Sequence, residues 1–542
     1  SITMPSMIDA PGRRTARQPL TRSPPPGSDL VGITSPAPGS YLVGKDCLLS
    51  DFRVRQTLVT PTGRDNTADR ASSSLSGGRI MTQLHQAHYA AGPTVCGANR
   101  DVVRNIKALI KRAHALSPAD VRLAEYMGLL SINVERPMGL NDGVFYPPSD
   151  IALDRAPATR PLRAARMSRA NAQPRKMHAL ALLVDFDDNV GKRPASEFHR
   201  MLFDASNPGS MTNFYKDLSN GKLLLTGEVK GYLRAPQPYA FYTDGRSGTG
   251  RNFPNNTPGL LRDALNLFCA TDTLKRFDTD GDGVVDGIFL IHAGRGAEAE
   301  PDPSKRPHMI WSHKWTLPKP FVNRNVKVFA YSTEPEDGRL GVFAHEFGHV
   351  LGLPDLYDTS YRSEGVGTWC LMGGGSWGGG GHRPTRMSCW CLSKLGWIKP
   401  RVTGDGSYAL ASLADEPNDC LRVPIGRRNG PEYFLLENRQ KRGRDAALPT
   451  SGLALWHIDE RQSGNTNPLA YKVGLVQADG KRDLEMNRNA GDAGDLFPGR
   501  VGRTTVSDRT NPSTRDNAGN PSGVVISAIK AAAGTVSFRL KT

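Results

Sequence analysis

The 542-residue sequence contains no run of 18 apolar residues and no pair of cysteines spaced as C-x-x-C. The first absence gives no reason to expect a membrane-spanning helix, and the second argues against a zinc site built from cysteines. Aromatic residues make up only 7% of the chain, whereas there are 57 glycines and 40 prolines. This composition favours loop-rich α/β and β structure over helical bundles, and the length indicates two or three domains.

The N-terminal part of the sequence also lacks the apolar periodicity of a folded domain. Residues 1–90 are rich in Ser, Thr, Pro, Gly and Arg and are predicted to be disordered. Two helices are predicted between residues 101 and 130. Together with the Arg-rich linker that follows, they would form a pro-segment over residues 91–176.

Acidic residues are too few to balance the basic ones, and the net charge is +16. The first 200 residues hold 27 Lys and Arg against 17 Asp and Glu. This excess lies in sequence such as Arg160–Lys176, which has no interleaved aromatic residues and indicates a solvated linker open to proteases. No nucleic-acid partner is therefore expected.

From residue 177 the sequence takes on the patterns of a folded α/β domain. The apolar run Met177–Phe186 is followed by acidic residues, as expected of a buried strand that ends at the edge of a sheet. Further strands are predicted at Val284–His292 and Val326–Glu334, and helices at Ala195–Phe203 and Gly259–Leu274. After residue 400, short strands separated by turn residues predict a β-rich, sandwich-like C-terminal domain over residues 401–542.

The segment Phe343–Asp358, FAHEFGHVLGLPDLYD, carries an HExxH pattern. On a helix, His345 and His349 share one face, so their imidazoles can bind one metal ion. Glu346 is placed to take a proton from a water molecule that the metal activates. Chance would give on the order of 0.01 such matches in a chain of this length, so the pattern predicts a zinc site.

A third ligand must come from the residues after this helix. Gly352 predicts the end of the helix and a sharp turn. That turn can bring Asp355, ten residues after His345, back to the metal. Asp358 and Glu364 are the alternatives. Three protein ligands would leave a fourth position open, as catalysis requires.

A glycine-rich segment, GTWCLMGGGSW, places Met372 23 residues beyond His349. A methionine in a tight turn beneath the metal forms the floor of metzincin-like active sites. Taken alone, such a Met is more often an ordinary core residue. Because it follows an extended zinc motif, we interpret it as a Met-turn residue.

These motifs resemble the immune inhibitor A family of secreted bacterial zinc metallopeptidases. The resemblance covers residues 177–530 and rests on HEFGHVLGLPDLYD, TWCLMGGGSW, FYKDLSNGKLLLTGEV, IWSHKW and the late segments VGLVQADGKRDLE and GDAGDLFPG. It implies a zincin-like α/β catalytic domain with an active-site helix over residues 177–400, and an extracellular endopeptidase made as a zymogen. It also implies zinc on His345, His349 and Asp355, with Glu346 as general base and Met372 as the Met-turn residue.

Such an enzyme would act on protein or peptide substrates, and we expect it to be a monomer. Its mechanism needs a further donor to stabilise the oxyanion. Many metzincins supply a Tyr two residues after the Met, but that position here is Gly374. Tyr361 and His382 are the remaining candidates for this donor, although each is also a common kind of surface or supporting residue.

Two other functions compete with that of an endopeptidase. A calcium-stabilised binding or adhesion protein with non-catalytic zinc would have no use for Glu346. An aminopeptidase would need an acidic anchor for the substrate α-amine, and Glu298 and Glu300 are candidates for that anchor.

Two acidic clusters indicate calcium sites, because alternating carboxylates that converge on a turn form a cage of hard oxygen ligands. The first is the loop DTDGDGVVDG, whose ligands would be Asp278, Asp280, Asp282 and Asp286. The second lies in a Gly-rich segment and consists of Asp479, Asp483, Asp492 and Asp495. The alternative is an acidic hairpin turn for the first cluster and a hydrogen-bonded lattice for the second.

The chain has seven cysteines, an odd number that leaves at least one thiol unpaired within it. Four of them fall between residues 370 and 420, where local disulfides can form in a secreted protein. Cys96, in PTVCGANRD, loosely resembles the cysteine switch of matrix metallopeptidases, whose thiolate caps the zinc. A purely structural role for Cys96 is the alternative.

Overall fold

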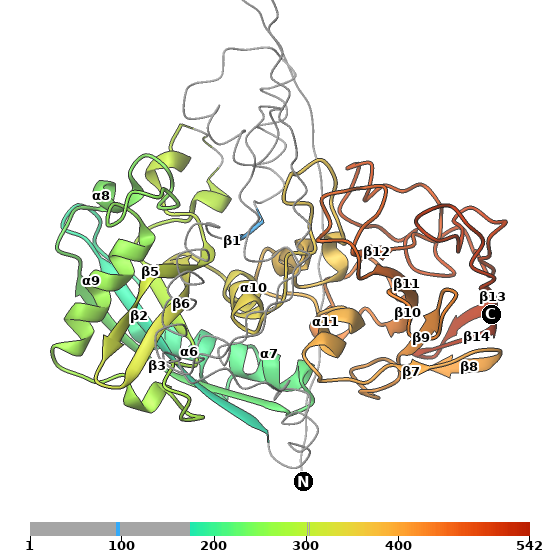
Figure 1. Ribbon diagram of the computed structural model, residues 1–542, viewed down its shortest axis with the longest axis horizontal. Coiled ribbons are helices and arrows are strands. Elements are labelled where there is room, and N and C mark those ends of the chain that lie inside the picture. The colour runs from blue at the N-terminus through green and yellow to red at the C-terminus, as the bar shows by residue number, and fades with distance from the viewer. Residues whose placement is uncertain (1–93, 98–173, 301, 303) are drawn as a thin grey trace, which may run out of the picture. The chain divides into compact units, whose positions relative to one another are not determined.

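The computed structural model describes residues 94–97, 174–300, 302 and 304–542 (Figure 1). Every described residue lies within the unit Ser72–Thr542. The predicted disorder of residues 1–90 and the predicted helices between residues 101 and 130 fall outside the described residues. Within the described part of the chain, no helix has both the length and the hydropathy needed to cross a membrane.

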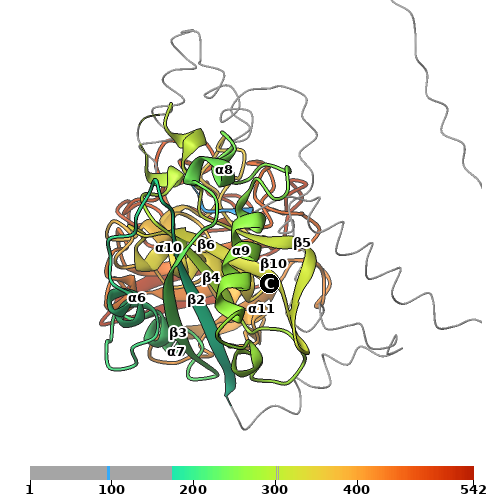
Figure 2. The same ribbon diagram turned by 90° about the vertical axis from the view of Figure 1, so that its left-hand side faces the viewer.

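A six-stranded mixed sheet is the centre of the first half of the described chain (Figure 2). Its strands are β1 (Thr94–Val95), β2 (Arg175–Asp185), β3 (Leu223–Arg234), β4 (Ile288–His292), β5 (His313–Asn323) and β6 (Val326–Pro335). They lie in the order β1-β5-β6-β4-β2-β3. The pairs β2–β3, β2–β4 and β4–β6 are parallel, whereas β5 is antiparallel to β6 and β1 is antiparallel to β5. A parallel sheet therefore ends in an antiparallel edge, to which the two-residue β1 is added.

Helices cover both faces of this sheet, and β2 shows why. Its odd-numbered residues from 177 to 183 pack into one core cluster, and its even-numbered residues from 180 to 184 pack into another. The first cluster includes side chains of α6 (Ala195–Leu202), α7 (Met211–Leu218) and α10 (Leu340–Val350), and the second includes side chains of α8 (Tyr239–Thr243) and α9 (Thr257–Cys269). A strand buried on both faces needs a continuous apolar run, which is the pattern seen in the sequence.

The predicted elements of this part are confirmed, with shifted ends. β2 begins at Arg175, inside the segment that the sequence assigned to the linker. β4 begins at Ile288, four residues later than predicted, because the preceding acidic segment forms a loop rather than a strand. α9 begins after Asn256, whose side chain accepts a hydrogen bond from Gly259 N, and it ends at Cys269 rather than at residue 274.

The second half of the described chain contains two further sheets. The five-stranded sheet has the order β12-β11-β10-β9-β7, and the three-stranded sheet has the order β13-β14-β8. Their strands are β7 (Arg401–Val402), β8 (Gly406–Leu410), β9 (Leu421–Pro424), β10 (Glu432–Arg439), β11 (Gly452–Asp459), β12 (Val473–Leu475), β13 (Val525–Ala532) and β14 (Thr535–Lys541). Short helices lie between the strands in both halves of the described chain. They are α11 (Cys389–Lys394) and the 3₁₀ helices η1 (Lys275–Phe277), η2 (Ala297–Ala299), η3 (Arg306–His308), η4 (Gly367–Trp369), η5 (Gly374–Trp377) and η6 (Gly443–Asp445).

The hydrophobic core continues across residue 400, where the sequence predicts a domain boundary. Phe434 and Leu436 of β10 pack into a cluster with residues of the three-stranded sheet. Tyr433 and Leu435, on the other face of β10, belong to the same cluster as Met372 and α10. The five-stranded sheet therefore packs against the three-stranded sheet on one face and against the part that carries the HExxH residues on the other.

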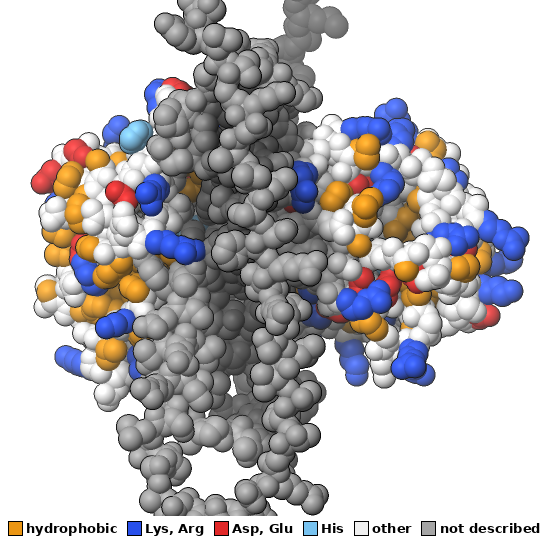
Figure 3. All heavy atoms as spheres, turned by 45° about the horizontal axis from the view of Figure 1, so that its top comes forward, with side chains coloured by type: hydrophobic (Ala, Val, Ile, Leu, Met, Phe, Trp, Pro, Cys, Tyr) orange, Lys and Arg blue, Asp and Glu red, His pale blue; other side chains and the backbone are white. Residues whose placement is uncertain are grey.

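Charged side chains are dispersed over the described surface. From residue 201 onward the chain holds 42 Lys and Arg against 36 Asp and Glu. On the face shown in Figure 3, the basic side chains lie among apolar and acidic ones rather than in one patch.

Candidate metal centre

α10, which carries the HExxH residues, is buried along its whole length. Two of its glycines allow it to lie directly on the glycine-rich turn. A Cβ at Gly341 would lie 1.8 Å from the backbone oxygen of Ser376, and a Cβ at Gly348 would lie 2.5 Å from Sδ of Met372. The helix ends as predicted, because Gly352 with φ +97° turns the chain sharply. The HExxH side chains are thus fixed between a rigid helix and a tightly packed turn.

We expect Gly341→Ala to lower the free energy of unfolding by about 1–3 kcal/mol, because the added methyl group overlaps a backbone atom that cannot rotate away. Gly464→Ala is the matched control, since nothing lies within 4 Å of a Cβ at that position. The control should change stability by less than about 0.5 kcal/mol. Urea unfolding of both variants checks this, and equal effects of the two substitutions would contradict the close approach of α10 to the turn.

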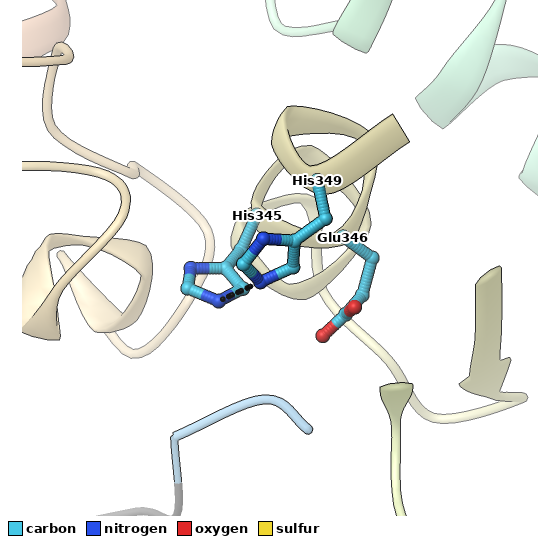
Figure 4. Close-up of side chains that lie close together, drawn as sticks. All are labelled: His345, Glu346 and His349. Carbon is cyan, nitrogen blue, oxygen red and sulfur yellow. Dashed lines mark hydrogen bonds between the residues drawn. The ribbon is translucent and has the colours of Figure 1, made fainter. Parts of the chain in front are cut away.

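The side chains of His345, His349 and Asp355 converge on one point. The two Nε2 atoms are 3.1 Å apart, and Oδ1 of Asp355 lies 3.1 Å from Nε2 of His345 and 3.3 Å from Nε2 of His349. Figure 4 shows the two imidazoles beside Glu346 on α10. A tetrahedral zinc ion with bonds of about 2.0–2.1 Å separates its ligand atoms by about 3.3 Å. The three donor atoms therefore match one face of a zinc coordination sphere.

Backbone carbonyls fix the tautomer of each imidazole. Nδ1 of His345 donates to the oxygen of Leu371 at 3.0 Å, and Nδ1 of His349 donates to the oxygen of Leu353 at 2.8 Å. Because a carbonyl oxygen only accepts, each neutral ring carries its proton on Nδ1 and presents the Nε2 lone pair to the centre. Two lone pairs and a carboxylate oxygen at these distances repel one another unless a cation lies between them.

The charge states of these groups suit a metal ion. Burial lowers the pKa of His349, so its imidazole is neutral near pH 7 and can bind a metal. Burial by itself would raise the pKa of Asp355, but the imidazoles of His349 and His345 hold it below its ordinary value. Asp355 is therefore a carboxylate, which is an accepted zinc ligand.

The two alternative third ligands, Asp358 and Glu364, have contacts with other parts of the chain. Oδ1 of Asp358 accepts hydrogen bonds from the backbone N and the hydroxyl of Ser360, and Oδ2 accepts the same pair from Ser363. Asp358 thus holds the loop after the metal-binding turn. The backbone N of Glu364 donates to the oxygen of Leu484, which places Glu364 against the C-terminal part of the chain. Asp355 is the candidate that the structure brings to the imidazoles.

Glu346 lies beside this cluster and is fully buried. Neither of its carboxylate oxygens forms a hydrogen bond with any described residue. One of its carboxylate oxygens lies within 4.8 Å of a ring nitrogen of His345 and of His349. Burial raises its pKa well above the ordinary value, and the carboxylates of Glu334, Asp355 and Glu298 raise it further. A buried carboxylate without a partner costs free energy, so its position next to a metal-binding cluster calls for a functional explanation.

Met372 lies beneath α10. Its Sδ packs against Gly348, its backbone oxygen accepts a hydrogen bond from Leu356 N at 2.7 Å, and the preceding carbonyl, of Leu371, binds His345. The Met segment therefore supports both the helix and the turn that delivers Asp355.

The region that contains these groups matches a known enzyme family. Residues 195–405 match the immune inhibitor A peptidase M6 catalytic domain. The family resemblance inferred from the sequence motifs is confirmed. The chain is 32% identical to immune inhibitor A of Bacillus thuringiensis subsp. alesti over 42% of this chain and 41% of that protein. It is also 32% identical to the pre-pro-metalloprotease PrtV of Vibrio cholerae serotype O1 over 41% of this chain and 30% of that protein. The chain thus spans less than half the length of the relatives it matches.

The two predicted oxyanion donors differ in position within the M6-like region. Tyr361 is buried in the loop after Asp358, and its ring centroid lies 5.7 Å from that of Tyr357. Tyr357 in turn lies 6.3 Å from the ring of His345. His382 is exposed and lines a surface hollow with Arg193 and Leu340, without any of the metal-binding residues. Tyr357, which the sequence analysis did not single out, is the tyrosine next to the imidazoles.

Lys314 on β5 is a second residue that sequence reasoning missed. It is buried, and burial lowers its pKa to about 8, while the negative charge of Glu346 opposes this shift. A buried cation that interacts with Glu346 contributes to the electrostatics of the site. The motif IWSHKW contains Lys314 and was the sequence feature that could have pointed to it, but the sequence analysis used this motif only as evidence of family resemblance.

The proposed amine anchors have other partners. Glu298 accepts hydrogen bonds from the hydroxyl of Ser312 at 2.7 Å and from its backbone N at 3.1 Å. Glu300 accepts a hydrogen bond from the backbone N of Asp302 at 2.9 Å and lies 3.4 Å from Arg295. Both carboxylates hold loops of the M6-like region together.

The four residues of the first acidic cluster do not all lie together in the structure. Carboxylate oxygens of Asp278, Asp280 and Asp282 lie within 4.8 Å of one another. Asp286 is not in this group, because its Oδ2 accepts hydrogen bonds from His178 N at 2.8 Å and from the hydroxyl of Thr279 at 2.6 Å. Three of the four predicted ligands are therefore together, and the fourth fastens the loop to β2.

The second acidic cluster corresponds to the hydrogen-bonded alternative. Its carboxylates have protein donors at 2.6–3.4 Å: Lys481 for Asp479, Arg488 and Asn489 for Asp483, Asn489 and Gly494 for Asp492, and Trp369 for Asp495. Among the described residues these four do not form a metal-ligand group. The calcium site at Asp479, Asp483, Asp492 and Asp495 stays a prediction, and backbone and side-chain donors of the protein already bind these carboxylates.

The six described cysteines are free thiols. The Sγ atoms of Cys370 and Cys391 lie 3.8 Å apart. The disulfides anticipated between residues 370 and 420 therefore stay a prediction.

Proposed function

We propose that this chain is a zinc-dependent endopeptidase that cleaves protein or peptide substrates, with Glu346 as its general base. The observation that carries the proposal is the convergence of three metal-binding atoms, 3.1–3.3 Å apart, beside a buried carboxylate that has no hydrogen-bond partner among the described residues. The match to a peptidase catalytic domain over residues 195–405 supports it independently.

In this proposal His345, His349 and Asp355 hold the zinc and leave a fourth position open. The metal, when bound, acts as a Lewis acid that polarises the scissile carbonyl and lowers the pKa of water. Glu346 accepts the proton of the attacking water and later gives it to the leaving amine. Its raised pKa suits it to hold that proton between the two steps. Met372 is the Met-turn residue, which holds the helix and the turn that contains Asp355 in their relative positions.

Tyr357 is the proposed donor to the oxyanion. Its ring packs against the ring of His345, whereas Tyr361 lies behind it and His382 faces solvent. A phenolic hydroxyl near the metal can stabilise the negative charge that develops on the carbonyl oxygen. Its closeness to His345 supports Tyr357 ahead of Tyr361 and His382, the two candidates taken from the sequence.

The competing functions have less support. A protein with a purely structural zinc would have no reason to bury Glu346 without a partner, since that burial costs free energy. An aminopeptidase would need a free acidic anchor, but Glu298 and Glu300 are bonded to the protein.

The decisive experiment is digestion of an unfolded substrate protein with and without a chelator, followed by peptide mapping. Internal cuts that the chelator abolishes support the proposal, and trimming of the N-terminus alone would overturn it in favour of an aminopeptidase.

Secretion and synthesis with a pro-segment are part of the same proposal. The Vibrio relatives carry the name pre-pro-metalloprotease, which describes proteins made with segments that are later removed. The Arg-rich residues 160–176 of this chain are a suitable place for such a cut.

A calcium ion at Asp278, Asp280 and Asp282 completes the proposal. Oδ1 of Asp278 and Oδ2 of Asp282 are buried and have no hydrogen-bond partner within the described part of the chain. Burial, and then the charge of Asp280, raises the pKa of Asp282 to about 6. Three neighbouring carboxylates without a cation would destabilise the fold, and a hard divalent ion would relieve that repulsion.

We expect calcium to raise the melting temperature of zinc-loaded protein, and Asp280→Asn to remove most of this increase. Calcium at about 100 times its Kd stabilises the folded state by about 2.7 kcal/mol. Asp479→Asn is the matched control, and it should keep the calcium effect because Asp479 is bonded to Lys481. Thermal unfolding with and without added calcium checks this. Loss of the effect in the control alone would assign the ion to the other cluster.

A further inference from the structure

Residues 94–97 lie along the edge of the sheet next to the proposed active site. β1 pairs with the outer edge of β5, with Thr94 opposite Lys314 and Val95 opposite His313. Cys96 N donates to the oxygen of Ser312 at 2.8 Å. An extended segment that adds to a free sheet edge in this way is a common form of peptide recognition.

Two tryptophan side chains fasten the residues that follow β1. Nε1 of Trp311 donates to the oxygen of Cys96 at 2.9 Å, and Nε1 of Trp377 donates to the oxygen of Gly97 at 3.1 Å. Trp377 ends η5, the 3₁₀ helix that follows Met372 and packs on α10. The segment is thus held from the sheet edge on one side and from the glycine-rich turn on the other.

This docking brings the residues that follow β1 beside Tyr357, the neighbour of His345. A Cβ at Gly97 would lie 3.4 Å from the ring of Tyr357, and that ring contacts His345. In Figure 4 the blue ribbon of this segment passes on the side toward which the side chains of His345 and Glu346 point. Cys96 is fully buried, and the one hydrogen bond that its thiol makes with a described residue is a long contact of 3.7 Å to the carbonyl oxygen of Gly97.

The surroundings of the Cys96 sulfur are acidic. Burial raises the pKa of its thiol well above the ordinary value, and the carboxylates of Glu346, Glu298 and Asp355 raise it further. Such a site keeps the sulfur protonated as long as no cation is present. A divalent metal held by the neighbouring imidazoles and carboxylate reverses this preference, because a coordinating thiol loses its proton.

We propose that Cys96 binds the zinc at the fourth position and keeps the uncut chain latent. This inference rests on the proposed metal centre. The sulfur binds as a thiolate, its proton leaves to solvent, and the water that Glu346 would activate is displaced. Tetrahedral zinc with one sulfur, two nitrogen atoms and one oxygen is then saturated.

The connection between β1 and β2 explains how latency ends. Residues 98–174 link the docked segment to the sheet and include the Arg-rich sequence. After a cut within that link, β1 is held only by non-covalent bonds and the metal–sulfur bond, so it can leave the edge of β5. The vacated edge and the fourth metal position then become available to a substrate chain.

Cobalt in place of zinc tests the inference on the full, uncut chain. Cobalt in a tetrahedral site absorbs in the visible range, and a thiolate ligand adds a charge-transfer band in the near ultraviolet. We expect both features in the wild type and in the control Cys269→Ser, since Cys269 lies at the end of α9. We expect Cys96→Ser to keep the visible bands and to lose the near-ultraviolet band.

Visible bands without a near-ultraviolet band in the wild type would overturn the role of Cys96 and leave the metal centre intact. Absence of tetrahedral bands from every variant would instead remove the metal centre itself, and the inference with it.

Thiol alkylation with mass spectrometry provides a second readout. Cys96 should be protected in the zinc-loaded uncut chain and labelled at least 10-fold faster after cleavage within residues 160–176. Equal labelling before and after cleavage would contradict release of the segment.

Discussion

Replacing Glu346 with Gln is expected to lower kcat/KM for peptide-bond cleavage by about 10²–10⁴-fold, the usual contribution of a general base. Gln has nearly the same shape and no basic carboxylate, so the variant should still fold and still bind zinc. The uncharged amide also removes a buried charge, and stability should not fall. The measurement is digestion of an unfolded protein by wild type and variant, with zinc content determined on the same samples.

Because the full chain is proposed to be latent, this comparison needs both the uncut chain and chain cleaved within residues 160–176. Glu197→Gln is the matched control, since Glu197 lies on α6 and makes an exposed ion pair with Arg193. The control should keep its activity within about twofold, because exposed ion pairs contribute little. Activity of the cleaved Glu346→Gln variant at the level of this control would exclude Glu346 as the base.

The second large effect is expected from Asp355→Asn, which should weaken zinc binding by at least about 100-fold. Even residues that only support a metal ligand change metal affinity by about 10–100-fold, and Asp355 is placed as a ligand itself. Loss of the carboxylate also removes the negative charge that interacts with both imidazoles. Competition with a chromophoric chelator measures the affinity directly, without any assay of activity.

Asp358→Asn separates ligand loss from loop damage. Asp358 accepts four hydrogen bonds from Ser360 and Ser363 and lies three residues after Asp355. Its substitution should lower the free energy of unfolding by about 1–3 kcal/mol, as expected when buried hydrogen bonds are broken, and should leave zinc affinity within a few-fold of the wild type. If Asp358→Asn loses zinc and Asp355→Asn retains it, the third ligand is Asp358.

Several features of the site could be predicted because they depend on neighbouring residues. The spacing of His345 and His349 fixes their common face on a helix, and Gly352 fixes where that helix ends. The apolar run of β2 follows from its burial on both faces. In the acidic loop before β4, Asp278, Asp280 and Asp282 lie together as their close spacing in the sequence suggests, whereas Asp286 is held by His178 and Thr279.

Other features could not be predicted, because they depend on contacts between distant segments. The choice of Asp355 among three acidic residues depends on how the turn packs on Met372. Tyr357 and Lys314 approach the centre from a loop and from β5, at positions 12 and 31 residues away from His345 along the chain. The second acidic cluster is satisfied by donors such as Trp369, 126 residues from Asp495.

The amino-acid sequence by itself determined the reactive groups and their local arrangement: two imidazoles and a carboxylate on one helix, a turn after it, and an acidic residue within reach. Helical periodicity and glycine conformation act over a few residues, so these features need no knowledge of the rest of the chain. Only the tertiary structure decided which carboxylate lies beside the two imidazoles, and only it placed Cys96 and Gly97 next to Tyr357. Cys96 reaches that position because β5 has a free edge and two tryptophans donate to the residues after β1, at separations of 215 and 280 residues.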